Sequence, residues 1–288
     1  MTPANAVAYH FAAGNAFFVG VGLLCAGLLL RAMEHGAKTR WSAFAFTAAG
    51  VLIVAFSATP LPYSVYAVWL ALMVTAWGMR GRVERAGYWT IGVACVLSLA
   101  LAAWEATHHR MPSVEAPPTE TLHVIGDSLA LGATEPEGNW PGRLGTALGI
   151  ETRNLSHGGA TLSSSLSNAR RIEGEEAYVI VAVGGNDLLQ GRFQEFRRDL
   201  RALLEIVCDG EREVLMLELP LPPFHNTFGR AQRRLAAEYG VTLVPKRRLA
   251  RILFTEDATI DGLHFNAKGH ALLARDLTAI MKNRRQAP

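Results

Sequence analysis

Apolar residues are concentrated in the first third of the chain. The sequence has 288 residues, of which 50% are hydrophobic, and nearly all of the apolar excess lies before residue 105. A segment of about 20 apolar residues is long enough to cross a bilayer as a helix. The sequence therefore predicts a transmembrane domain of four helices in residues 1–104, followed by a globular domain. The four predicted spans are about Phe11–Leu30, Trp41–Thr59, Tyr63–Met79 and Gly87–Trp104.

Lysine and arginine residues indicate the orientation of the predicted spans. They occur in the first and third connections and are absent from the second connection and from the residues before Phe11. Because positive residues favour the cytoplasmic side, we expect both termini and the globular domain to lie outside the cytoplasm. The residues that carry this argument are Arg31, Lys38, Arg40, Arg80, Arg82 and Arg85.

A proline-rich stretch separates the two predicted domains. Pro112, Pro117 and Pro118 predict an extended linker over residues 105–120. Residues 121–288 then alternate strand-like and helix-like patterns, which predicts a three-layer α/β fold around a parallel five-stranded sheet. The strand candidates are Leu122–Ile125, Glu151–Leu155, Ala177–Val183, Val214–Leu219 and Val241–Val244. The helix candidates are Trp140–Leu148, Phe193–Val207, Arg230–Tyr239 and Ala267–Met281, the last with Asn266 as its N-cap.

Polar residues with catalytic potential follow several of the predicted strands. In parallel α/β sheets, ligands bind beyond the carboxyl ends of the strands. Gly126-Asp127-Ser128-Leu129 follows the first strand, and a serine at such a turn into a helix is accessible and lies beside a helix N-terminus, which favours negative charge. The other turns bring Gly159, Asn186, and Asp261 with His264. Together these residues supply the nucleophile, base, carboxylate and oxyanion donors of serine acyl transfer.

These turns resemble the signature blocks of the SGNH (GDSL) hydrolases. Gly126-Asp127-Ser128-Leu129, the turn at Gly159, Gly185-Asn186-Asp187 and Asp261-Gly262-Leu263-His264 occur in the family's order and at about its spacing. Trp140-Pro141 and Asn266 resemble the bacterial branch of small periplasmic thioesterases, arylesterases and lysophospholipases. The resemblance covers about Thr121–Lys282 and implies a flavodoxin-like fold. Phe265 departs from that branch, which usually carries proline there, and we expect a local change in the turn without loss of a catalytic group.

The resemblance implies a role for each site residue. Ser128 would be the nucleophile, His264 the general base and Asp261 the carboxylate that orients the imidazole. The oxyanion hole would consist of the backbone N–H groups of Ser128 and Gly159 and the side-chain amide of Asn186. Three neighbouring residues have simpler interpretations: Asp187 shapes a turn, His157 is a loop residue and His123 lies beside the core.

The sequence thus predicts a membrane-anchored serine esterase or lipase of the bacterial inner membrane. We expect its substrate to be an acyl ester, lipid or lysophospholipid-like, and we expect no cofactor, no metal and, with a net charge of only +3, no nucleic-acid partner. One alternative is an O-acetyl esterase or transferase acting on envelope polysaccharide. Another is a non-catalytic membrane protein that binds acyl chains or glycan. The spans would either present the substrate or serve only as an anchor.

Overall fold

The chain forms two units. The computed structural model describes residues 1–33, 36–79, 84–112, 114, 121–132, 138–174 and 177–282. A helical unit contains residues His10–Arg110 and Leu221–Thr227, and an α/β unit contains Met1–Tyr9, Met111–Pro220 and Phe228–Pro288. These units cross the predicted division into 1–104, 105–120 and 121–288, which stays a prediction. Part of the proline-rich stretch, with Pro117 and Pro118, and the basic residues Arg80 and Arg82 lie outside the described residues.

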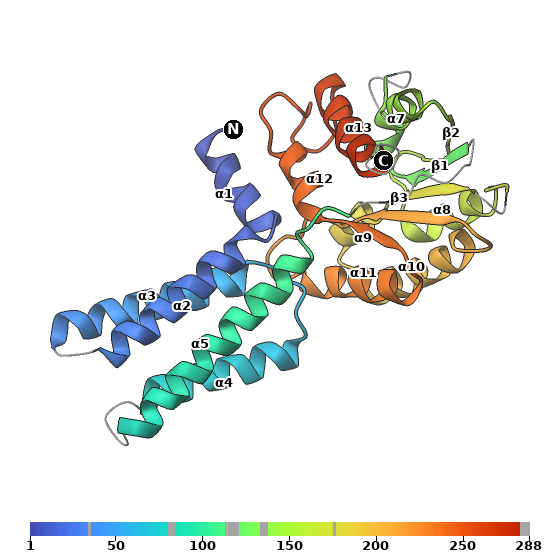
Figure 1. The fold of residues 1–288 in the computed structure, drawn as a ribbon. Helices are drawn as coiled ribbons and strands as arrows, with labels where there is room; N and C mark the ends of the chain where they lie inside the picture. Colours follow the sequence, from blue (N-terminus) through green and yellow to red (C-terminus); the bar gives the residue numbers. More distant parts are fainter. Residues whose placement is uncertain are drawn as a thin grey trace, which may run out of the picture. The chain divides into compact units, whose positions relative to one another are not determined.

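Helices α1 to α5 make up the described N-terminal part of the chain (Figure 1). Over the described ranges, α2, α3 and residues Ala86–Thr107 of α5 are long and apolar enough to cross a membrane. The predicted span Tyr63–Met79 forms α4, a shorter apolar helix of 17 residues. Length and composition therefore support three of the four predicted spans, and α4 as the fourth span stays a prediction. The helices are α1 (Pro3–Ala12), α2 (Asn15–Ala32), α3 (Ala37–Phe56), α4 (Tyr63–Met79) and α5 (Glu84–Thr107).

The helix boundaries correct the prediction at both ends of this region. The first predicted span began near Phe11, but the helix is interrupted before α2, where Gly14 adopts a φ of +83° that a side chain would disfavour. Residues before this break form α1, which the sequence did not predict. At the other end, α5 continues to Thr107, so the first residues of the predicted linker are helical.

Close packing joins the helices of the helical unit. A Cβ atom added at Gly50 of α3 would lie 2.8 Å from Leu24 Cγ of α2, so only glycine permits this approach of the two backbones. The Trp69 indole of α4 donates a hydrogen bond of 2.8 Å to Ser98 Oγ of α5. These contacts hold α2 against α3 and α4 against α5 (Figure 1).

A five-stranded parallel sheet organises the α/β unit, in the order β2-β1-β3-β4-β5. This confirms the predicted fold class. The strands are β1 (Thr121–Gly126), β2 (Glu151–Asn154), β3 (Tyr178–Ala182), β4 (Glu213–Leu217) and β5 (Thr242–Val244). The order changes direction beside β1, which pairs with both β2 and β3. The turns that follow β1 and β3 therefore meet at the position where parallel sheets bind their ligands.

Helices cover both faces of this sheet. The α7, α12 and α13 helices share one apolar core with the sheet, and α10 packs against α8. The predicted helices α7 and α10 have the expected bounds, and the short α6 follows the turn into a helix that was expected after the first strand. The short α8, α9 and α12 were not predicted. The helices are α6 (Ser128–Leu131), α7 (Trp140–Leu148), α8 (Leu162–Ala169), α9 (Gly185–Gln190), α10 (Phe193–Val207), α11 (Asn226–Glu238), α12 (Lys246–Leu253) and α13 (Ala267–Lys282).

Candidate active site

A tight turn between β1 and α6 presents Ser128. Gly126 ends the strand, and a Cβ atom there would lie 2.8 Å from Ser156 Oγ, so the turn requires glycine. Asp127 caps α6, since its Oδ1 accepts a 2.9 Å hydrogen bond from the backbone N–H of Leu129. Ser128 is therefore the first residue of a short helix at the carboxyl end of a central strand.

His264 links Ser128 to Asp261. Its Nε2 lies 3.1 Å from Ser128 Oγ, and its Nδ1 lies 2.6 Å from Asp261 Oδ2. A carboxylate only accepts hydrogen bonds, so in neutral His264 the proton sits on Nδ1, and Nε2 is left to accept the hydroxyl proton of Ser128. The structure brings together the three residues that the sequence predicted as a triad.

Asp261 also fixes the turn that carries His264. Its Oδ1 accepts hydrogen bonds from the backbone N–H groups of Leu263 at 3.0 Å and His264 at 2.8 Å. The hydrogen bond from the His264 ring, followed by these backbone bonds, holds the pKa of Asp261 well below its ordinary value. The carboxylate therefore stays charged beside His264.

Phe265 secures this turn from the core side. Its side chain is buried, and the residue forms an antiparallel bridge with Thr259 while the backbone N–H of Ile260 donates to the His264 carbonyl at 2.8 Å. As expected, this departure from the family pattern leaves His264 in contact with Ser128. Asn266 caps α13 as predicted, because its Oδ1 accepts from the backbone N–H groups of Lys268 and Gly269.

The two remaining oxyanion candidates meet at one turn. Gly159 has a φ of +70°, and the Asn186 side-chain amide donates a 2.8 Å hydrogen bond to the carbonyl of the next residue, Ala160. Asn186 is the second residue of α9, which follows β3. An amide carries two N–H bonds, so the Asn186 amide has a second donor besides the one on Ala160. The role of Ser128, Gly159 and Asn186 as an oxyanion hole stays a prediction.

Neighbouring polar residues support the loops. Asp187 Oδ2 accepts a 3.0 Å hydrogen bond from the backbone N–H of Leu162 and so ties α9 to the start of α8. His157 Nε2 lies 3.0 Å from Ser164 Oγ. His123 is 1% exposed within β1. These contacts agree with the structural interpretations of Asp187, His157 and His123.

Two buried titratable groups were missed by the sequence analysis. Burial raises the pKa of Asp127 to about 6, although the Leu129 N–H and the charge of His264 act in the opposite direction. Burial, with a smaller effect from Arg143, lowers the pKa of His270 to about 4. His270 Nδ1 accepts a 3.2 Å hydrogen bond from the backbone N–H of Trp140. The sequence shows both residues but carries no signal of their burial.

Metal ligands are not grouped in the described parts of the chain. Over those ranges, no three or more His, Cys, Asp or Glu side chains are arranged to hold a metal ion.

Comparisons with known proteins place this fold in a family. The GDSL-like lipase/acylhydrolase family matches residues 124–272, just over half of the chain. The chain belongs to the GDSL-like lipase/acylhydrolase family. This confirms the resemblance seen in the four sequence blocks. The match begins in β1 and ends in α13, so it covers the α/β fold and excludes α1 to α5.

Two solved structures that are similar to this GDSL-like hydrolase agree with its assignment to the family. The crystal structure of TesA is 25% identical, with a TM-score of 0.51, and the match covers 56% of this chain and 98% of TesA. The esterase EstA from Pseudoalteromonas sp., in a structure inhibited by monoethylphosphonate, shares the fold at 20% identity, with a TM-score of 0.50 and coverage of 55% and 94%. The comparison with curated proteins found no match. The GDSL-like protein is a carboxylic ester hydrolase.

Proposed function

We propose that the protein is a membrane-anchored serine esterase or lipase that hydrolyses acyl esters, with lipid or lysophospholipid-like substrates, through Ser128, His264 and Asp261. One observation carries this proposal: His264 contacts Ser128 Oγ through one ring nitrogen and Asp261 through the other, at 3.1 and 2.6 Å. A histidine held between a hydroxyl and a carboxylate is the arrangement that activates a serine nucleophile.

The proposed reaction starts with attack of Ser128 Oγ on the ester carbonyl carbon. His264 Nε2 takes the hydroxyl proton as the new C–O bond forms, and Asp261 stabilises the resulting imidazolium. His264 then returns the proton to the leaving alkoxide oxygen as the old ester bond breaks, which leaves an acyl-serine. A water molecule, deprotonated by His264, then attacks the acyl carbon. As the acyl C–O bond breaks, His264 returns the proton to Ser128 Oγ, and the carboxylic acid is released with free Ser128.

The developing negative charge needs donors that are already in position. In the proposed site these are the backbone N–H groups of Ser128 and Gly159 and the second amide N–H of Asn186. The hydrogen bond from Asn186 to Ala160 supports this assignment, because it fixes the amide beside the turn of Gly159. Donors that need no rearrangement stabilise the tetrahedral intermediate most effectively.

The proposed location is the bacterial inner membrane, with the hydrolase and both termini outside the cytoplasm. The apolar lengths of α2, α3 and α5 support an anchor, and a helix of 17 residues such as α4 is at the lower limit for a fourth span. Cysteine labelling tests the topology in a cysteine-free background. A membrane-impermeant thiol reagent added to intact spheroplasts should label Glu211→Cys and leave Lys38→Cys unlabelled; the reverse pattern would refute the orientation.

A panel of esters tests the proposed activity. Purified full-length protein is given esters from acetyl to palmitoyl, together with phospholipid and lysophospholipid, alongside Ser128→Ala. We expect turnover of long-chain esters that disappears in Ser128→Ala and persists in Ser163→Ala, a matched change at an exposed serine of α8. Turnover in Ser128→Ala would refute the assignment of Ser128 as the nucleophile. Turnover of acetyl esters alone would favour the alternative of an O-acetyl esterase or transferase acting on envelope polysaccharide.

A further inference from the structure

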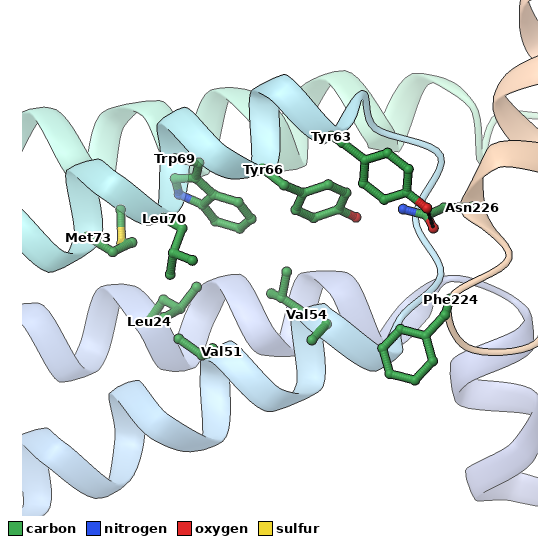
Figure 2. Close-up of a pocket in the computed structure, with 11 residues that line it drawn as sticks. Leu24, Val51, Val54, Tyr63, Tyr66, Trp69, Leu70, Met73, Phe224 and Asn226 are labelled. Atoms are coloured by element: carbon green, nitrogen blue, oxygen red, sulfur yellow. Dashed lines mark hydrogen bonds between the residues drawn. The ribbon is translucent and has the colours of Figure 1, made fainter.

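An apolar pocket lies within the helical unit. It has a volume of about 290 Å³ and lies between α4 on one side and α2 and α3 on the other (Figure 2). Its walls are almost entirely hydrocarbon and aromatic. The lining includes Leu24 of α2, Val51 and Val54 of α3, and Trp69, Leu70 and Met73 of α4.

Polar groups gather at one end of this pocket. There the Tyr63 hydroxyl donates a 3.2 Å hydrogen bond to Asn226 Oδ1, and the Tyr66 hydroxyl donates a 3.0 Å bond to the Thr59 carbonyl. Figure 2 shows Met73 and Leu24 toward the opposite end, where the lining is apolar. The pocket is therefore amphipathic along its length, as is a lipid chain that ends in an ester.

The polar end of the pocket is closed by a loop that lies outside helices α2 to α4 in the sequence. Leu221–Thr227 connects β4 to α11 in the sequence, yet it belongs to the helical unit, and its Phe224 and Asn226 line the pocket. Phe224 has a φ of +67°, a conformation that is rare for an aromatic residue. Its ring packs against Phe56 of α3, with 5.0 Å between the ring centroids. A loop of the hydrolase sequence thus contributes to a pocket of the apolar helices.

The size and surroundings of the pocket point to an acyl chain. A methylene group is about as large as a molecule in liquid water, roughly 30 Å³, so the pocket has room for on the order of ten methylene groups. Two of its walls, α2 and α3, are long and apolar enough to cross a membrane, where acyl chains are the abundant apolar molecules.

We infer that this pocket binds the acyl chain of the lipid ester that the enzyme hydrolyses, with the ester end toward Tyr63 and Asn226. The inference rests on the proposed function and extends it by assigning the helices a part in substrate binding. It gives the helical unit a role that an anchor alone does not need.

A pocket-filling substitution tests the inference. Ala55 lines the pocket and is exposed on α3, so Ala55→Trp places an indole in the pocket without replacing a core residue. Ala45→Trp is the matched control, since Ala45 is exposed on the same helix and does not line the pocket. Both variants are made in the full-length protein and reconstituted in lipid nanodiscs.

Photocrosslinking provides a readout that needs no catalysis. The nanodiscs contain a few per cent of a phospholipid with a photoreactive decanoyl chain, and the protein carries Ser128→Ala so that the probe is not cleaved. We expect crosslinks on the pocket-facing residues of α3 and α4, reduced about tenfold or more by Ala55→Trp and unchanged by Ala45→Trp. Equal crosslinking in both variants, or crosslinks spread over all lipid-facing positions, would overturn the inference.

Turnover with Ser128 intact separates this inference from the proposed function. Ala55→Trp should lower kcat/KM for a decanoyl ester about tenfold or more while turnover of an acetyl ester stays near that of Ala45→Trp. Serine-dependent acetyl turnover with decanoyl turnover unaffected by Ala55→Trp would refute the pocket and leave the proposed function standing. Pocket-dependent crosslinking without serine-dependent hydrolysis of any ester would refute the proposed function and, with it, the assignment of the bound chain to a substrate.

Discussion

His264 Nε2 lies 3.1 Å from Ser128 Oγ, although the two residues are 136 positions apart in the sequence. One residue begins α6 after the first strand of the sheet, and the other lies in the turn that precedes the last helix. Their contact joins the turn after β1 to the turn before α13. The proposed catalysis by this pair therefore depends on the integrity of the whole sheet.

Asp261→Asn tests the part of the carboxylate in this contact. The amide retains an oxygen that can accept from the backbone, but it no longer holds the proton on His264 Nδ1 or stabilises the imidazolium. We expect kcat for a soluble ester to fall by up to roughly 10⁴-fold with little change in KM, by the logic of other serine triads. A loss of less than a few-fold would show that another group orients His264.

Asn186→Ala tests the oxyanion assignment. Removing one donor from an oxyanion hole costs on the order of a hundredfold in kcat, because the donor acts mainly on the transition state. Asn168→Ala is the matched control, since Asn168 also donates its amide to a loop carbonyl, that of Leu155, at 2.9 Å. Equal losses of kcat in both variants would indicate that Asn186 supports the loop and does not act as an oxyanion donor.

Asp127→Asn should change how stability depends on pH. The pKa of Asp127 is raised by burial from 3.8 to about 6 in the folded state, so the folded protein binds an extra proton and loses stability as pH rises through this range. Asparagine carries no such charge and can still accept from Leu129. We expect the free energy of unfolding of the variant to match that of the native protein below about pH 4 and to exceed it above pH 6, by about 3 kcal/mol. A constant difference across this range would contradict the buried ionisation.

His270→Asn should show the opposite trend. The pKa of His270 is lowered from 6.5 to about 4, mainly by burial, so the native fold loses stability as pH falls from about 6.5 toward 4. Asparagine can replace the acceptor for Trp140 but does not titrate. The melting temperature of the variant relative to native protein should therefore rise on acidification through this range. A difference that does not vary with pH would show that His270 does not titrate as inferred.

Gly269→Ala tests the packing behind the catalytic turn. An added Cβ would lie 2.9 Å from Phe265 Cδ1 and closer still to the Ala258 carbonyl, so the turn that carries His264 must shift. Overpacking of this kind costs about 1–3 kcal/mol, and we expect a lower melting temperature together with lower kcat. Gly158→Ala is the control for stability, because its Cβ would meet nothing closer than 4.0 Å. Equal melting temperatures in the two variants would contradict this packing argument.

Long elements with regular patterns were predictable, and short ones were not. The start of α7 follows from Pro141 near the first helical position, and the bounds of α10 follow from apolar residues at helical spacing. In contrast, α8 begins Leu-Ser-Ser-Ser and α12 begins Lys-Arg-Arg, and neither shows an apolar stripe long enough to recognise. The break at Gly14 was missed because glycine is tolerated within apolar helices, so its presence alone does not mark an end.

The candidate site was predictable because its chemistry lies in short local blocks. Ser128, Asn186 and the Asp261–His264 pair each follow a strand or precede a helix, and parallel sheets gather such turns at one edge. The burial of Asp127 and His270 was not predictable, since it arises from residues that are distant in the sequence. The same holds for the packing of Phe265 against Gly269 and Ala258.

The sequence by itself determined the family, the parallel α/β fold and the candidate residues for ester hydrolysis, because strand periodicity and short polar turns are local patterns. Only the tertiary structure decided that the loop carrying Phe224 and Asn226 joins the apolar helices and closes a pocket between them. The physical reason is that a pocket forms where the side chains of several packed elements leave space between them. That property belongs to the packing of several elements together and is not encoded in any one of them.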